Sequence, residues 1–119
     1  MGAPATPERT MTDQVTIARG SVYLSSEIYQ RHFAGLAAVI LLRRGYDLAI
    51  LPVRHAAAGG YLLKRRNAKG DLVVNAGDFL RFQGIPDDAK FTFAASWDPS
   101  LSGLVACGAF SNLKSGELT

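Results

Sequence analysis

The residues best suited to bind a ligand form a dense basic run with a tight turn beside it. Lys64-Arg65-Arg66 precedes Asn67-Ala68-Lys69-Gly70, a composition typical of a turn between two strands. Five cations and no carboxylate occur between Leu48 and Gly70, so this stretch favours an anionic partner. A second basic pair, Arg43-Arg44, precedes another turn signal at Gly45. Both sites could contact the phosphates of a nucleic acid.

Catalytic and metal-binding patterns are missing from the sequence. The histidines, His32 and His55, are not part of an HExxH motif, and there is no CxxC or Gly-rich phosphate loop. We interpret His32 as a half-buried helix residue and His55 as part of a linker. Asp71 and Asp78 could approach each other, but Asp78 is expected at a helix N-terminus. We therefore expect no enzyme activity, no metal and no cofactor.

Composition sets the class of protein. The chain has 119 residues, 48% of them hydrophobic and 19% charged, which predicts one folded domain. Its longest apolar run, Leu36 to Leu42, has seven residues, whereas a membrane helix needs about 20. The single cysteine, Cys107, lies in an apolar run and is expected to be a buried structural thiol. We expect a cytoplasmic protein with no membrane segment.

Hydrophobic periodicity predicts short strands and two short helices between a disordered leader at 1–13 and a flexible tail at 111–119. Ser25 or Ser26 is expected to cap the first helix. Asn75 is expected to cap the second helix, with Asp78 in a capping-box position. Trp97 is expected in a loop. The expected elements are strands at 14–18 and 21–24, a helix at 27–34, strands at 37–43 and 48–53, a linker at 54–60, strands at 61–66 and 71–74, a helix at 76–82, and strands at 90–95 and 103–110.

The order of these elements occurs twice. Gly20 aligns with Gly70, and Ser25 with Asn75, at an offset of fifty residues. A ββαββ unit of this size cannot bury a core alone, but two units can pair their sheets. The sequence thus predicts a mainly β fold with two short helices (α+β), in which duplicated ββαββ units (14–53 and 61–110) form one pseudo-two-fold β-barrel and one domain (14–110).

Two segments resemble a known family. GSVYLSSEI and NAKGDLVVNAGDFLRFQGI are similar to the loop–strand–helix core of SpoVT/AbrB-type swapped-hairpin domains. The tandem layout resembles the MraZ family, which implies DNA binding, transcription regulation and assembly into rings. Lys69 and Gly70 match the family's turn, but Ser21 and Asp71 stand where it has Arg. Since this position meets DNA in the family, we expect Asp71 to repel phosphate.

Strand geometry divides the basic run between two sides. Lys64 and Arg66 should share one face, with Lys69 at the tip and Arg65 on the other face. With Arg43-Arg44 at the matching end of the other half, the two tips would form a cationic rim on one side of the barrel. The first hypothesis is a small non-enzymatic regulator that binds duplex DNA as a homo-oligomer. The expected phosphate contacts are Arg43, Arg44, Lys64, Arg65, Arg66 and Lys69. Arg19 is a further candidate for a phosphate contact.

Other readings of the same residues remain open. The basic run can be a solvated hairpin whose charges prevent edge-to-edge aggregation. The chain can instead be an adaptor or accessory protein that binds a larger protein or enzyme, which Ser21, Asp71 and the modest net charge of +3 favour. Binding of a small molecule in the barrel is a third reading. The AVILL strand and Trp97 suit either an oligomer interface or the core.

Overall fold

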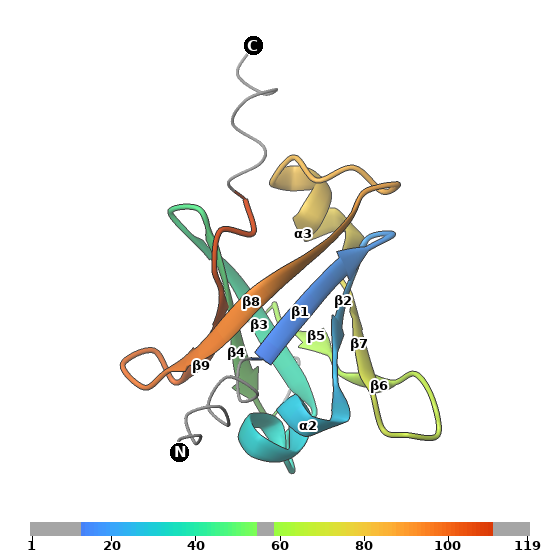
Figure 1. Cartoon of the computed structure of the whole chain (residues 1–119), viewed down its shortest axis with the longest axis vertical. Coiled ribbons are helices and arrows are strands. Elements are labelled where there is room, and N and C mark those ends of the chain that lie inside the picture. The colour runs from blue at the N-terminus through green and yellow to red at the C-terminus, as the bar shows by residue number, and fades with distance from the viewer. Residues whose placement is uncertain (1–12, 55–58, 111–119) are drawn as a thin grey trace, which may run out of the picture.

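A single antiparallel sheet, rolled into a nearly closed barrel, makes up most of the protein. The computed structural model describes residues 13–54 and 59–110. Helices α2 and α3 lie at opposite ends of the barrel (Figure 1). The elements are β1 (Asp13–Ala18), β2 (Ser21–Leu24), α2 (Ser26–Ile28), the π-helical turn η1 (Tyr29–Phe33), β3 (Ala38–Arg44), β4 (Asp47–Val53), β5 (Tyr61–Leu62), β6 (Lys64–Arg65), β7 (Leu72–Asn75), α3 (Gly77–Phe82), β8 (Lys90–Asp98) and β9 (Gly103–Ala106).

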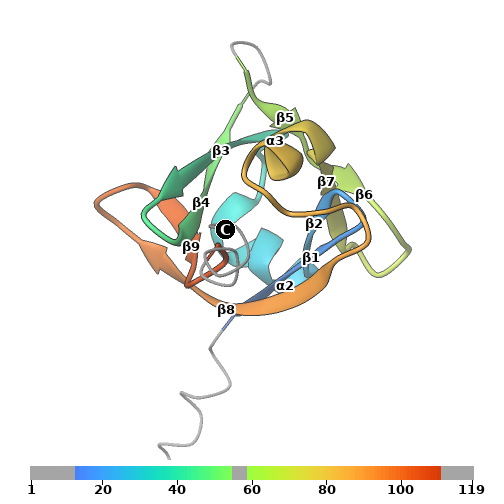
Figure 2. The ribbon, with the colours of Figure 1, turned by 90° about the horizontal axis from the view of Figure 1, so that it is seen from above.

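One short segment joins the two ends of the sheet. The strand order is β5-β3-β4-β9-β8-β1-β2-β7-β6, and only Leu63 separates β5 from β6. Tyr61 pairs with Val39 in β3, whereas Lys64 pairs with Val73 in β7. The backbone N–H of Leu63 also donates to Ala37 O at 2.9 Å. The segment therefore brings the two ends together and closes most of the barrel (Figure 2), which confirms the mainly β, barrel-like fold.

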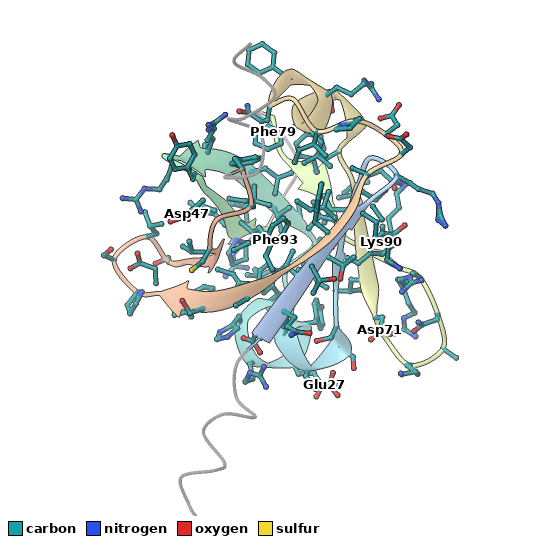
Figure 3. The ribbon with its side chains drawn as sticks, turned by 45° about the horizontal axis from the view of Figure 1, so that its top comes forward. Glu27, Asp47, Asp71, Phe79, Lys90 and Phe93 are labelled. Carbon is teal, nitrogen blue, oxygen red and sulfur yellow. The ribbon has the colours of Figure 1, made fainter. Side chains whose placement is uncertain are left out.

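Alternating side chains fill the barrel. Strand β1 buries Val15 and Ile17 completely and leaves Gln14 exposed, as a half-buried strand should. Phe33 and Phe110 add large, fully buried rings from outside the strands. Phe93 also points inward (Figure 3), since its neighbour across the sheet is Val15. The core thus draws on both halves of the chain.

The first helix follows its expected cap. The hydroxyl of Ser25 accepts a hydrogen bond from the Ile28 N–H at 3.1 Å. This confirms the capping serine, but the helix changes type after one turn and becomes a π-helix that ends at Phe33. Residues of this π-helical turn pack against β1 and β8, so tertiary contacts accompany the change of helix type.

The second helix corrects the expected cap. Its N-cap is Ala76 and forms no side-chain cap hydrogen bond. Asn75 is still in strand β7, opposite Ser21, and its Oδ1 accepts a hydrogen bond from the Ser21 hydroxyl at 2.9 Å. Asp78 accepts from the Tyr61 hydroxyl at 3.1 Å rather than closing a capping box. The side chain of Asn75, which the local sequence predicts as a helix cap, therefore takes part in a cross-strand hydrogen bond instead.

Two further expectations about the C-terminal half are wrong. Trp97 lies in strand β8, which continues to Asp98, and not in a loop. Cys107 is exposed, not buried, because β9 ends at Ala106 and the chain then turns. Periodicity located both strands but misjudged where they end. Asp13, expected as the last residue of the leader, is instead the first residue of β1. The expectations for the leader before Asp13, for most of the linker including His55, and for the tail fall outside the described residues.

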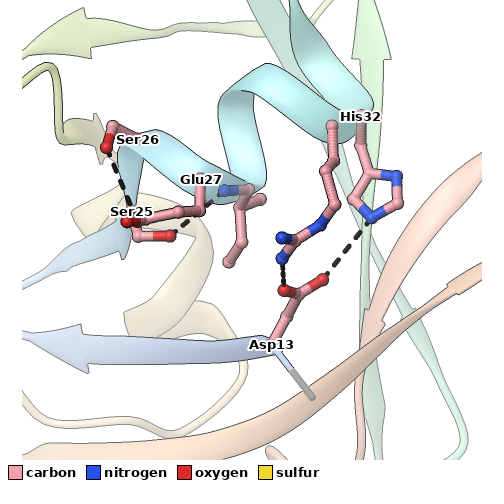
Figure 4. Close-up of polar contacts among 7 residues, drawn as sticks. Asp13, Ser25, Ser26, Glu27 and His32 are labelled. Atoms are coloured by element: carbon pink, nitrogen blue, oxygen red, sulfur yellow. Dashed lines mark hydrogen bonds and ion pairs between the residues drawn. The ribbon is translucent and has the colours of Figure 1, made fainter. Parts of the chain in front are cut away.

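A charged cluster holds the π-helical turn against the barrel. The carboxylate of Asp13, buried at the start of β1, forms an ion pair with Arg31 (Figure 4). His32 Nε2 lies 3.4 Å from the same carboxylate, and the imidazole stacks on Trp97 at 4.7 Å between ring centroids. Burial, followed by the positive charge of Arg31, lowers the pKa of His32. Because Arg31 already neutralises Asp13, the neutral imidazole is the favoured form.

Replacing Ser25 by alanine tests the capping serine. We expect Ser25→Ala to lower the free energy of unfolding by about 1 kcal/mol, the usual cost of losing an N-cap acceptor. Ser26→Ala is the matched control, since its hydroxyl makes only a 3.5 Å contact with Glu27. Urea denaturation measures both variants, and equal losses would contradict the role of Ser25.

Trp97, the single tryptophan, reports on His32. Because the pKa of His32 is lowered in the folded protein, the neutral imidazole contributes to stability above about pH 6.5. This contribution is lost as the pH falls through the folded-state pKa. Protonated imidazole withdraws an electron from excited indole, so tryptophan fluorescence should fall over the same range. His32→Gln should remove this step. A step that persists in the variant would assign it to another group.

Candidate nucleic-acid interface

The hairpin between β6 and β7 protrudes from the barrel wall (Figure 2). Its turn is built by Asn67, whose side-chain oxygen accepts from the backbone N–H of Lys69 at 3.0 Å and of Asp71 at 3.2 Å. Gly70 has a φ of 94°, a left-handed conformation that a glycine adopts without strain. The turn expected at 67–70 is therefore fixed by its own side chains.

Asp71 clamps this hairpin to the barrel. Its carboxylate accepts from the Ser26 N–H at 2.9 Å and from the Asn67 side chain at 3.0 Å. Ser26 is the first residue of α2, so the aspartate also satisfies a free N–H at a helix start. The hydrogen bond from Asn67, then that from Ser26, lowers the pKa of Asp71. Asp71 thus has a structural role that the comparison with the family's Arg did not suggest.

The four cations of the hairpin are all exposed: Lys64, Arg65, Arg66 and Lys69. In the described part of the chain, no side-chain nitrogen of these four residues lies within 4.0 Å of a carboxylate oxygen. Lys64 lies opposite Val73, on the outward row that also contains Tyr23. Arg65 lies opposite Leu72, which points inward. The division of the run between two sides therefore follows the strand alternation.

Arg66 sits over an aromatic ring on the outer wall. Its guanidinium carbon is 4.7 Å from the centroid of Tyr23, and this contact holds the side chain against β2. The planar group keeps its edge free to bind phosphate oxygens. Tyr23 belongs to a row of outward residues that crosses five strands: Thr92, Thr16, Tyr23, Val73 and Lys64.

Two additional cations share a shallow hollow with Arg66. This hollow, of about 590 Å³, brings together Arg19 from the β1–β2 turn and Lys90 from the start of β8, with Asp88 as its single acidic group. We call the hairpin cations, Arg19 and Lys90 together the cationic side. Arg19 is only a further candidate on the sequence, and Lys90 is not predicted at all, because its position near Arg66 depends on the pairing of Lys90 with Ala18.

Arg43 and Arg44 lie away from the cationic side. Arg43 donates to Gln83 at the end of α3, and its guanidinium carbon lies 5.0 Å from the centroid of Phe110. Arg44 is 4.0 Å from Asp98. The β6–β7 turn is instead next to Ser26 in α2, at the opposite end of the barrel (Figure 1). Figure 3 likewise shows Asp71 and Lys90 on one side and Asp47, beside Arg44, on the other.

The expected rim of two basic tips on one side is therefore wrong. The hairpin turns of an antiparallel barrel point to both ends, and the sequence does not show which end each turn occupies. Cationic side chains gather instead along one wall, from the β1–β2 turn to the β6–β7 turn.

Other kinds of site find less support in the geometry. Within residues 13–54 and 59–110, no three His, Cys, Asp or Glu side chains are placed to hold a metal ion. The same residues include no helix of the length and hydropathy that crossing a bilayer requires. His32 is stacked and partly buried rather than open to a substrate.

Comparison of the chain with family models, with curated proteins and with solved structures gave no match. The similarity to SpoVT/AbrB-type domains accordingly stays a prediction.

Asp71→Ala tests the clamp. We expect amide hydrogen exchange to accelerate at Ser26 and Gly70, because the variant removes the acceptor that joins hairpin and helix. Asp88→Ala is the control, since it removes an exposed carboxylate from a loop. The clamp in the wild type should also weaken in acid: a lowered pKa gives stability above about pH 4 that is lost as the pH falls through the folded-state pKa. Unchanged exchange in Asp71→Ala would contradict the clamp.

Proposed function

We propose that this chain is a non-enzymatic regulator that binds duplex DNA through its cationic side. The observation that supports the proposal best is the β6–β7 hairpin: its turn is fixed by Asn67 and Asp71, while its four cations stay exposed and without carboxylate partners among the described residues. A side chain that is not engaged in an internal ion pair can bind phosphate without first breaking one.

The shape of the hairpin also favours a duplex. A two-stranded ribbon fits the major groove of B-form DNA, and the flanking cations can meet the phosphates on either side. Arg66, Arg19 and Lys90 extend the contact along the outer wall. Among the residues that the structure describes, this wall offers one outward ring, Tyr23, for stacking, whereas proteins that bind single strands usually stack several bases. The proposed compartment is the cytoplasm.

We also propose that the barrel arose by duplication. Exchanging β1, β2, β3 and β4 with β5–β6, β7, β8 and β9 converts every strand pair of the sheet into an observed pair, and β2–β7 and β4–β9 convert into themselves. Between β2 and β7 the offset of fifty converts the pair Val22–Val74 into Leu24–Leu72. In each half, a polar residue after the turn glycine makes a hydrogen bond to the other half: Asp71 accepts from Ser26 at the start of α2, and Ser21 donates to Asn75, the last residue of β7.

The second candidate is an adaptor that binds another protein. It is favoured by a separate observation: Leu42 in β3 and Leu62 in β5 are 42% and 52% exposed, on the part of the sheet formed by β5, β3, β4 and β9. The two candidates differ in which wall meets the partner, so substitutions on each wall can separate them.

Salt dependence of DNA binding tests the first candidate. Lys64→Ala with Arg66→Ala should weaken binding to random-sequence duplex and reduce the slope of log affinity against log salt by about 2, since each phosphate contact contributes about 0.9. The matched control is Arg43→Ala with Arg44→Ala, which removes the same charge at the other end and should change the slope little. Fluorescence anisotropy measures both variants after circular dichroism has shown that they are folded.

Two results would contradict the proposal. Equal losses in both variants would mean that net charge, and not the cationic side, governs binding. No binding by the wild type at low salt would leave the hairpin as a solvated edge and favour the adaptor.

A further inference from the structure

The outer wall opposite the cationic side is apolar. It is formed by outward side chains of β5, β3, β4 and β9, where Ile40 lies opposite Leu51 and Leu42 lies in register with Ala49 and Val105. Leu62, opposite Ala38, continues the surface onto β5. We define the apolar face as Ile40, Leu42, Leu51, Val53, Leu62 and Val105. The corresponding row on the other wall is more polar, since Val73 is its one aliphatic residue beside Thr92, Thr16, Tyr23 and Lys64.

Among the described residues, charged groups border the apolar face at its two ends and where β5 passes into β6, since Lys64 follows Leu62 by two positions. At the α3 end, Arg44, Asp47 and Asp98 line one hollow beside Val105, so one cation stands beside two carboxylates there, while Arg43 lies over the Phe110 ring. At the other end, Arg54 directly follows β4. If two copies of the face meet with their strands antiparallel, the acidic end of each copy lies against Arg54 of the other. The face is therefore complementary to itself in charge as well as in hydrophobicity.

The size of the face sets the strength of such a contact. Strands β5, β3, β4 and β9 have two, seven, seven and four residues, and at ordinary rise and spacing they present roughly 300–350 Å² of flat area. A standard stable interface buries about 800 Å² on each partner. The face is thus large enough for a reversible dimer but not for a permanent one.

We propose that the apolar face binds a second copy of this chain, with strands antiparallel across the interface. The two hairpins then lie on the far sides of the dimer, because the cationic side and the apolar face occupy opposite walls (Figure 2). A dimer of this shape holds two separate duplexes and bridges them, rather than setting both hairpins on one duplex. This consequence rests on the proposed DNA binding.

Sedimentation of the full chain tests the dimer. The wild type should dimerise with a dissociation constant on the order of 1–100 µM. Leu42→Glu with Leu62→Glu should weaken the dimer at least ten-fold, and both side chains are exposed enough to change without opening the core. Phe82→Glu is the matched control, since Phe82 is 86% exposed on α3 and outside the face. Its dimerisation should be unchanged.

The orientation has its own test. Arg54→Glu should weaken the dimer several-fold, because it sets a carboxylate against the acidic end of the partner. Arg65→Glu makes the same charge change on the β6–β7 hairpin, outside the apolar face, and should not weaken the dimer. A wild type that stays monomeric at all accessible concentrations would overturn the proposal and would leave a different protein as the occupant of the face. Equal effects of Arg54→Glu and Arg65→Glu would overturn the antiparallel arrangement.

Bridging is measured by capture of a fluorescent duplex on an immobilised one. The wild type should capture it. Leu42→Glu with Leu62→Glu should bind each duplex singly but capture at least ten-fold less. Lys64→Ala with Arg66→Ala should dimerise normally but bind each duplex more weakly, and it should therefore capture less. A dimer that binds no DNA would refute the proposed function and leave the interface standing, whereas a dimer that binds DNA without capture would refute the bridging geometry.

Discussion

Closure of the barrel by the short segment Tyr61 to Arg66 is the constraint on which the rest of the structure depends. A strand of ordinary length would extend one edge of the sheet and leave the other edge open. Here the segment bends at Leu63, so that β5 pairs with β3 and β6 with β7. Few backbone groups are then left at open edges, which would otherwise pair with other chains. The same bend directs the basic run outward, so closure and the proposed binding site have one cause.

The clamp of Asp71 links this closure to the helices. Its hydrogen bonds to Ser26 and Asn67 join the hairpin, the start of α2 and the barrel wall. At the other end of the barrel, Gly20 approaches Gly77 so closely that an added Cβ would lie 3.2 Å from its Cα. Both turns are thus packed against a helix start of the opposite half. This reciprocity accounts for the polar residues after each turn glycine, which the SpoVT/AbrB comparison could only describe as departures.

The sequence predicted well what local periodicity and turn chemistry determine. The strands, the turn at Asn67 and the capping Ser25 follow from alternation, glycine placement and side-chain acceptors, and the structure agrees. It predicted poorly what depends on pairing. Asn75 looks like a helix cap by its neighbours but is used by Ser21 across the sheet. Cys107 follows an apolar run, yet it is exposed because the strand has already ended.

The candidate site shows the same limit, since register and the direction of each turn decide which cations meet. Charge alone groups Arg43 and Arg44 with the hairpin, but they lie at the α3 end of the barrel. Lys90 instead lies near Arg66 because β8 pairs with β1.

The central claim is that duplex DNA meets the cationic side. Titration of the isotopically labelled protein with duplex, followed by amide chemical shifts, tests it most directly. We predict shifts at residues 64–70, Arg19 and Lys90, with the turn at Arg44 and Gly45 unchanged; shifts confined to β3, β4 and β9, or no shifts at all, would contradict the claim.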